Sequence, residues 1–220
     1  MRIKVNDKIV FVFDLDDTLY PEIDYLKSAY STISSKLRPY TGVALYDEML
    51  VRYHKKENVF QWIAETYRDA QPDISFDWLL AEYREHYPSI QLNAGTKAFL
   101  KKVKDLSIRS GLITDGRSVT QRNKIKALGI EQCFADIIIS EEFGSAKPDE
   151  KNYLYFQKKY PGCDFYFFGD NTAKDFIVPA KLGWTTVCLK NTGRHIHPQH
   201  FSATPRPDYV ISNFTEVTLC

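Results

Sequence analysis

Short, continuous apolar runs recur along this 220-residue chain and constrain its fold more than any other feature. Polar or turn-forming residues bound each run, which is typical of strands buried on both faces of a parallel sheet. The predicted strands are Ile9–Phe13, Ser110–Thr114, Asp136–Ser140, Asp164–Gly169, Thr185–Leu189 and Asp208–Ile211. Helical patterns alternate with the strands at 118–129, 149–160 and 173–183. The sequence therefore predicts an α/β fold with a mainly parallel sheet.

The interval from Tyr20 to about Asn93 interrupts this alternation. Its apolar residues recur at three- and four-residue spacing, which indicates helices at 23–37, 44–56, 59–70 and 76–87. Proline-containing turns separate these helices at Pro39–Gly42, Pro72–Asp73 and Pro88–Ser89. We expect a Rossmann-like three-layer core formed by residues 1–19 and 94–220. Residues 20–93 would form an inserted α-helical cap. Its aromatic side chains could line a substrate pocket, but the simpler interpretation is that most of them pack its helices together.

The bulk composition argues against several classes of function. A formal net charge of +1 gives no electrostatic reason to expect nucleic acid or an anionic membrane as a partner. No apolar run approaches the roughly 20 residues of a membrane-spanning helix, and the first residues do not resemble a signal peptide. The four cysteines lack metal-ligand spacing and are interpreted as reduced thiols. We expect a cytoplasmic protein, either a monomer or a homodimer.

The segment Asp14-Leu15-Asp16-Asp17-Thr18 places three carboxylates directly after the first buried run. Side chains alternate along a strand, so Asp14 and Asp16 point the same way. Two carboxylates about 4 Å apart repel each other by about 4 kcal/mol at an effective dielectric near 20. A bound divalent cation removes that penalty because its own charge dominates the local field. The segment therefore predicts a metal site at the end of this strand.

Three other predicted strands end in residues of related chemistry. Thr114-Asp115-Gly116 ends one strand, Lys147 follows another, and Asp170 and Asp175 follow a third in the segment GDNTAKD. In an open parallel sheet, ligands bind at the carboxyl ends of the strands, where neighbouring connections diverge. We therefore expect these acids, the hydroxyl group and the lysine to meet in one crevice.

The set Asp14-x-Asp16-x-Thr18, Thr114, Lys147 and Gly169-Asp170-x4-Asp175 resembles the four motifs of the haloacid dehalogenase (HAD) superfamily. The resemblance covers nearly the whole chain, and the helical insertion falls where one large class of the superfamily has its cap. The departures from the family motifs are small. The fourth motif has threonine where many relatives have proline after the asparagine. In the second motif, aspartate replaces the usual asparagine after the threonine. The resemblance implies a hydrolase, and the presence of Asp16 implies phosphate esters rather than haloacids.

The resemblance also implies a mechanism of phosphoryl transfer through an aspartyl-phosphate. Asp14 would be the nucleophile, and Asp16 the general acid and base. Thr114 would donate a hydrogen bond to a phosphoryl oxygen, and Lys147 would neutralise charge on Asp14 and on the transferring group.

The remaining motif residues are implied to hold a cofactor and the phosphate. Mg²⁺ would be bound by Asp14, the backbone carbonyl of Asp16 and Asp170. Asn171 and Asp175 would orient these ligands from behind. The phosphate-binding residues implied by the resemblance are Thr114, Asp115, Gly116 and Lys147.

The preferred interpretation is a Mg²⁺-dependent phosphatase that acts on a small phosphorylated metabolite, such as a sugar phosphate or a nucleoside monophosphate. A phosphomutase of the β-phosphoglucomutase type is an alternative and would require water to be kept from the intermediate. A phospho-receiver signalling module is a non-enzymatic alternative. The resemblance argues against it, because receivers carry their metal-binding acids and their phosphorylated aspartate on separate strands and have no helical insertion.

Three histidines lie in the polar loop between Asn191 and Pro207, at His195, His197 and His200. They could ligate a metal, but the loop itself offers no carboxylate or thiol beside them. We therefore interpret them as residues of a solvated loop.

Overall fold

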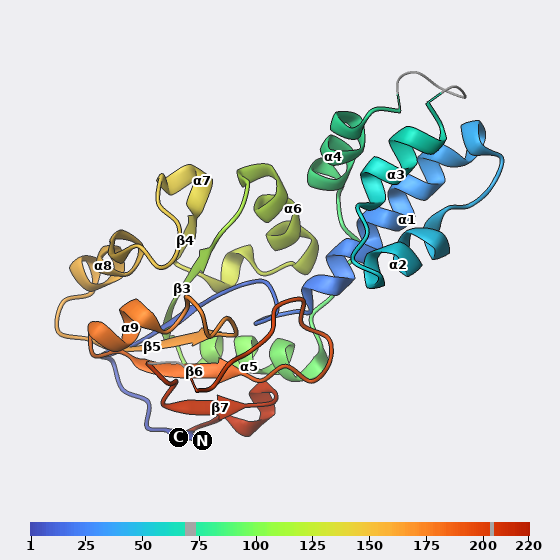
Figure 1. Ribbon diagram of the computed structural model, residues 1–220. Helices are drawn as coiled ribbons and strands as arrows, with labels where there is room; N and C mark the ends of the chain where they lie inside the picture. Colours follow the sequence, from blue (N-terminus) through green and yellow to red (C-terminus); the bar gives the residue numbers. More distant parts are fainter. Residues whose placement is uncertain (69–73, 203–204) are drawn as a thin grey trace.

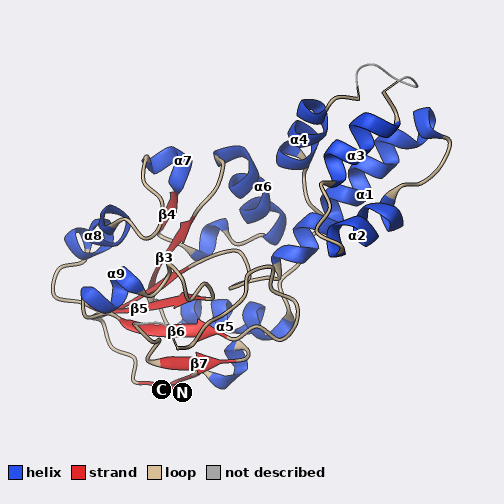
Figure 2. Ribbon diagram, in the orientation of Figure 1, coloured by secondary structure: helices blue, strands red, loops and turns tan. Residues whose placement is uncertain are grey.

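The computed structural model describes residues 1–68, 74–202 and 205–220. Its centre is a six-stranded sheet with the strand order β4-β3-β2-β5-β6-β7, in which every neighbouring pair is parallel (Figure 2). The strands are β2 (Ile9–Phe13), β3 (Arg109–Thr114), β4 (Asp136–Ile139), β5 (Asp164–Gly169), β6 (Thr185–Leu189) and β7 (Tyr209–Ile211). The predicted α/β fold with a mainly parallel sheet is confirmed.

Both faces of the sheet are covered, and this gives the core three layers. Phe11 and Phe13 of β2 pack on one face against α5 and α6, whereas Val10 and Val12 pack on the other against α8 and α9. This alternation explains why the strand is apolar at every position. The helical elements around the sheet are α5 (Ala94–Asp105), α6 (Ser118–Leu128), η1 (Glu131–Cys133), α7 (Ser140–Phe143), α8 (Glu150–Lys159), α9 (Ile177–Lys181) and η2 (Phe214–Glu216).

Four further helices form a bundle beside the sheet (Figure 1). They are α1 (Glu22–Thr41), α2 (Tyr46–His54), α3 (Val59–Thr66) and α4 (Phe76–Glu85). The bundle has its own apolar core, which includes Ile33, Met49 and Ile63. Most aromatic side chains of the segment pack against that core, as expected, whereas Tyr25 belongs to the core on the α5 face of the sheet.

The boundaries of α1 and α9 are among those that differ from the sequence-based prediction. Helix α1 continues through Pro39 to Thr41, and Gly42 ends it with φ of 72°. Helix α9 is shorter than predicted, because Asp175 accepts hydrogen bonds from the backbone N–H groups of Asp170 and Asn171 and holds the preceding segment in turns. The predicted turn at Pro72–Asp73 lies outside the described residues.

Two short elements near the ends of the chain were not anticipated. Strands β1 (Arg2–Ile3) and β8 (Thr218–Leu219) pair in parallel and form a separate two-stranded sheet. They bring the two termini together below β7 (Figure 1). Two residues are too few to produce a recognisable pattern in a sequence. None of the helices in the described part of the chain is both long and apolar enough to cross a membrane.

Candidate active site

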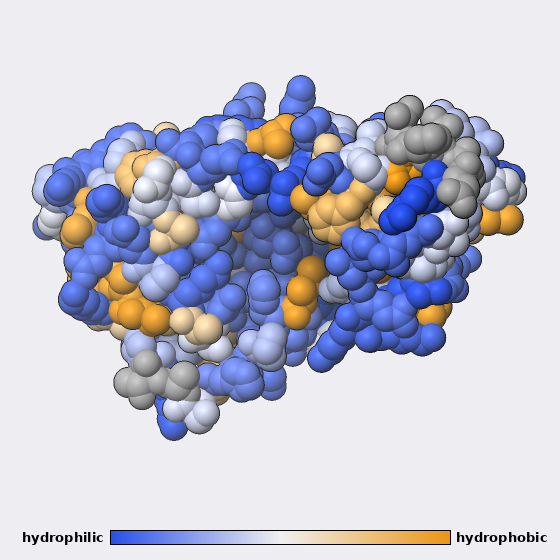
Figure 3. All heavy atoms as spheres, turned by 45° about the horizontal axis from the view of Figure 1, so that its top comes forward, coloured by the Kyte–Doolittle hydropathy of each residue, from blue (hydrophilic) through white to orange (hydrophobic). Residues whose placement is uncertain are grey.

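The four motifs meet at the carboxyl edge of the sheet because their strands are neighbours. Strand β2 lies between β3 and β5, and β4 lies next to β3. A cavity of about 90 Å³ opens there. Its lining includes Asp14, Asp16, Thr114, Asp115, Lys147, Asp170, Asn171 and Asp175, together with Glu22, Lys174 and His197. Figure 3 shows the molecule hollowed between its two lobes, with hydrophilic residues on the floor of the hollow.

Asp14 is buried at the end of β2 and is held from both sides. Its backbone N–H donates to Phe168 O on β5 (2.8 Å), Lys147 Nζ donates to Oδ1 (2.5 Å), and Thr18 Oγ1 donates to Oδ2 (3.0 Å). Burial raises the pKa of Asp14 to about 8, although the charge of Lys147 opposes the shift. The positive charge of the protein therefore compensates the Asp14 carboxylate only in part. Such an incompletely compensated carboxylate is suited to binding an added cation.

Lys147 is fully enclosed between two carboxylates. Its Nζ lies 2.5 Å from Asp14 Oδ1 and 2.9 Å from Asp175 Oδ1. Burial alone would lower the pKa of Lys147, but the charges of Asp14 and Asp175 raise it well above its usual value. Asp115 fixes the loop, because its Oδ1 accepts the Lys147 backbone N–H and its Oδ2 pairs with Lys174 Nζ (2.7 Å). Lys147 therefore carries a positive charge at a defined position.

The carboxylates at this edge fit a divalent cation. Oxygens of Asp14, Asp170 and Asp175 all lie within 4.8 Å of one another. Asp170 Oδ2 is buried and has no hydrogen-bond partner among the described residues, and burial raises the pKa of Asp170. Asp175 Oδ2 accepts the Asn171 backbone N–H (2.9 Å), which fixes the turn that presents Asp170. A buried carboxylate oxygen without a donor is suited to a hard cation such as Mg²⁺.

Asp16 is bound by helix α6 of the core, which the sequence did not reveal. Lys124 Nζ donates to Oδ1 (2.8 Å) and Oδ2 (2.9 Å), Gln121 Nε2 donates to Oδ2 (3.0 Å), and Tyr20 Oη donates to Oδ1 (2.5 Å). Burial alone would raise the pKa of Asp16, but these charged and polar partners lower it. Gln121 and Lys124 are three residues apart on a buried face of α6, and only this spacing could have drawn attention to them.

Thr114 lines the acidic cavity, whereas Gly116 is not part of its lining, and both residues are hydrogen-bonded to neighbouring side chains. Gln121 Nε2 donates to Thr114 Oγ1 (2.5 Å), and the Gly116 backbone N–H donates to Ser140 Oγ (2.8 Å). Gly116 has φ of 143°, and a Cβ atom there would lie 3.1 Å from Gln121 Cδ. A glycine at this position therefore leaves room for Gln121.

The histidine loop is only partly solvated, so the expectation for His195 was wrong. His197 and His200 are exposed, but His195 is half-buried and its Nδ1 lies 3.5 Å from Asp170 Oδ2. The carboxylates near His195 are those of Asp17 and Asp170, which belong to other segments of the chain. Both lie close enough to His195 to share a cation with it. Asp17 Oδ2 accepts the backbone N–H of Ile196 (2.7 Å) and so fastens the loop over the site.

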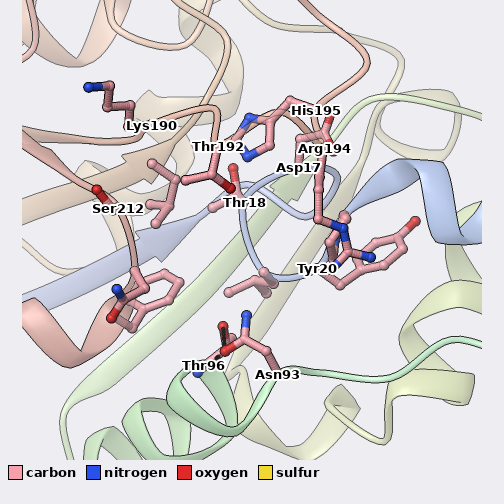
Figure 4. A pocket seen from close by; sticks show the side chains of 15 residues that line it. Asp17, Thr18, Tyr20, Asn93, Thr96, Lys190, Thr192, Arg194, His195 and Ser212 are labelled. Carbon is pink, nitrogen blue, oxygen red and sulfur yellow. Dashed lines mark hydrogen bonds between the residues drawn. The ribbon is translucent and has the colours of Figure 1, made fainter.

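A second pocket of about 120 Å³ lies beside the segment that follows β2. Figure 4 shows it between Thr18 and Asp17 on one side, Thr96 and Asn93 of the α5 N-terminus, and Lys190 with the loop that follows it. The Thr18 hydroxyl at its wall already donates to Asp14. This pocket flanks the segment that follows β2 and shares no lining residue with the acidic cavity.

Comparison with known proteins agrees with the fold and with this arrangement. The family model described as haloacid dehalogenase-like hydrolase matches residues 11–188. The chain belongs to this family of hydrolases.

A curated protein from Methanocaldococcus jannaschii, named glyceraldehyde 3-phosphate phosphatase, is 35% identical over 122 residues, which are 54% of this chain and 51% of that protein. This match thus spans about half the length of that relative. A protein of the same name from Methanopyrus kandleri is 23% identical over 220 residues and 94% of each chain. The structure of the putative HAD-hydrolase YfnB from Bacillus subtilis, bound to magnesium, has a TM-score of 0.66 at 18% identity and covers 96% of this chain and 97% of its own. It shares the fold.

Proposed function

We propose that this protein is a Mg²⁺-dependent phosphatase that hydrolyses a small phosphate monoester, a sugar phosphate or a nucleoside monophosphate, through an aspartyl-phosphate on Asp14. The main support is the position of the Asp14 carboxylate, 2.5 Å from the buried Lys147 Nζ and within 4.8 Å of the Asp170 and Asp175 oxygens. Relatives named glyceraldehyde 3-phosphate phosphatase support a small phosphorylated substrate.

In the proposed first step, a carboxylate oxygen of Asp14 attacks phosphorus and the bond from phosphorus to the ester oxygen breaks. Asp16, in its protonated form, gives a proton to the departing alkoxide, which leaves as an alcohol. The partners that lower the pKa of Asp16 make this form the minor one in the free protein. In the second step water attacks the phosphorus of the aspartyl-phosphate and loses a proton to Asp16, and the bond from phosphorus to the Asp14 oxygen breaks. Inorganic phosphate departs, and both aspartates return to their starting states. Lys147 and the hydroxyl of Thr114 stabilise the charge that develops on the phosphoryl oxygens.

The residues that would hold Mg²⁺ are Asp14, Asp170 and the backbone carbonyl of Asp16. When bound, the ion supplies positive charge to the Asp14 carboxylate and the phosphoryl oxygens. Asp175 and Asn171 keep the Asp170 turn in place, because Asp175 Oδ2 accepts the backbone N–H groups of both Asp170 and Asn171. The magnesium-bound structure of YfnB, which has the same fold, supports the choice of metal.

We also propose that residues 20–93 act as a cap over a core made of residues 1–19 and 94–220. The bundle begins at Glu22, which itself lines the acidic cavity, so its orientation bears directly on access to the site. Its last helix meets α6 of the core, where Thr120 Oγ1 donates to Arg84 O (2.9 Å). Closure of the cap would exclude water and select the substrate.

Hydrolysis of a panel of phosphate monoesters, including glyceraldehyde 3-phosphate and nucleoside monophosphates, tests the proposal. Activity should require Mg²⁺ and should fall by more than about 10³-fold in Asp14→Asn, because an amide is no nucleophile. Asp7→Asn is the matched control, since Asp7 is exposed and far from the cavity lining. If Asp14→Asn retains wild-type turnover, the assigned nucleophile is wrong.

A further inference from the structure

The structure assigns Gln121 of α6 a positioning role, in which its side-chain amide aligns the hydroxyl of Thr114 and the carboxylate of Asp16 together. The inference rests on the proposed function, which gives Thr114 to a phosphoryl oxygen and Asp16 to the leaving oxygen. Gln121 itself would not touch the substrate. It belongs to none of the four motifs and acts through two residues that do.

The amide of Gln121 has two N–H hydrogens, and each has an acceptor. Its Nε2 lies 3.0 Å from Asp16 Oδ2 and 2.5 Å from Thr114 Oγ1. A hydroxyl oxygen that accepts one hydrogen bond still has its own hydrogen to donate. Because Gln121 occupies the oxygen of Thr114, the Thr114 hydrogen is directed elsewhere, and a phosphoryl oxygen in the adjoining cavity can accept it.

The burial of Gln121 shows that its polar contacts are specific. The side chain is 1% exposed, and an apolar side chain would be the easier choice at such a site. Gly116 adds a second, independent feature, since its φ of 143° and its missing Cβ leave space for the Gln121 side chain. The segment around Gly116 therefore has a shape that accommodates the Gln121 amide.

Lys124 distinguishes the role of Gln121 from simple charge compensation. Lys124 Nζ already contacts both oxygens of Asp16, at 2.8 and 2.9 Å. Gln121 is therefore not needed to neutralise Asp16. Its specific contribution is the link from Asp16 to Thr114, which couples the group at the leaving oxygen to the group at the phosphoryl oxygen.

The test compares two substrates in Gln121→Met, which keeps the side-chain length and removes both donors. With an alkyl phosphate, whose leaving group needs a proton, kcat should fall by about 10²-fold. With 4-nitrophenyl phosphate, whose leaving group needs little help, kcat should fall by no more than about tenfold. Binding of orthovanadate, measured by calorimetry in the presence of Mg²⁺, should weaken by about tenfold because the Thr114 hydroxyl is no longer aligned.

The matched control is Lys126→Met on the same helix, because Lys126 is exposed, and it should match the wild type in all three measurements. Gln121→Leu also removes both donors and has a similar volume, so it should show the same selective loss if Gln121→Met unfolds. Equal losses on both esters, or unchanged vanadate binding in a folded variant, overturn the inference while Asp14-dependent activity still supports the proposed function. If the wild type hydrolyses neither ester, both proposals fail.

Discussion

Replacement of Lys124 by methionine tests whether the buried ion pair with Asp16 contributes to stability. The Lys124 side chain is 3% exposed and that of Asp16 is 18% exposed, and Lys124 Nζ contacts both carboxylate oxygens. Nζ also lies 4.4 Å from the centre of the Tyr25 ring. Methionine fills nearly the same volume, so the substitution removes the charge and leaves little cavity.

Loss of one partner from a buried ion pair costs about 3–5 kcal/mol, because the other charge remains buried without compensation. Asp16 keeps hydrogen bonds from Tyr20 and Gln121 and is slightly exposed, so the lower end of this range applies. We expect Lys124→Met to lower the free energy of unfolding by about 3 kcal/mol. For a chain of this length, that loss corresponds to a fall in Tm of about 6–12 °C.

Urea denaturation of Lys124→Met, Asp16→Asn and the double variant measures the coupling directly. The double variant removes both charges of the Lys124–Asp16 pair, so it should be at least about 1.5 kcal/mol more stable than the sum of the two single losses predicts. The exposed Lys126→Met should change stability by less than about 0.5 kcal/mol. Additive losses in the double variant would show that the two side chains do not interact as described.

Three further predictions concern other parts of the molecule. In Gly111→Ala, the new Cβ would lie 2.1 Å from Phe156 Cε1, so the free energy of unfolding should fall by about 1–3 kcal/mol in urea titrations; an unchanged value would mean that β3 and α8 are not packed as described. Burial raises the pKa of Asp136, but hydrogen bonds from Lys159 and two tyrosines outweigh this and lower it. The stabilisation is therefore present above about pH 4 and lost as the pH falls through the folded pKa, so Asp136→Asn should lose less stability than the wild type between pH 6 and pH 3; parallel curves would refute this. Mg²⁺ at 100 times its Kd should stabilise the wild type by about 2.7 kcal/mol in thermal unfolding, and the gain should shrink in Asp170→Asn; an equal gain would exclude Asp170 as a ligand.

The sequence alone predicted that the residues of the four motifs would lie close together at one edge of the sheet. Asp14, Thr114 and Asp170 each end or directly follow a continuous apolar run, and Lys147 follows another after a short connection. Such runs predict parallel strands, and the carboxyl ends of parallel strands meet at one edge of a sheet. The arrangement of these residues therefore follows from local pattern and from a general rule of topology.

Contacts between segments that are distant along the chain could not be predicted from local sequence patterns. Lys124 is 108 residues from Asp16 along the chain, and its spacing from Gln121 on α6 does not show which other segment it contacts. His195 was assigned to a solvated loop because its carboxylate neighbours come from other segments, and it lies 3.5 Å from Asp170 Oδ2.

Local pattern thus determined the six strands of the central sheet and the residues at their ends, because burial on both faces imposes an apolar run on the sequence. The tertiary structure alone decided that α6 would supply Gln121 and Lys124 to Asp16 and Thr114. The reason is that the partner of a side chain depends on where another segment of the chain packs. The spacing of residues within one helix or loop does not give the distance to that other segment.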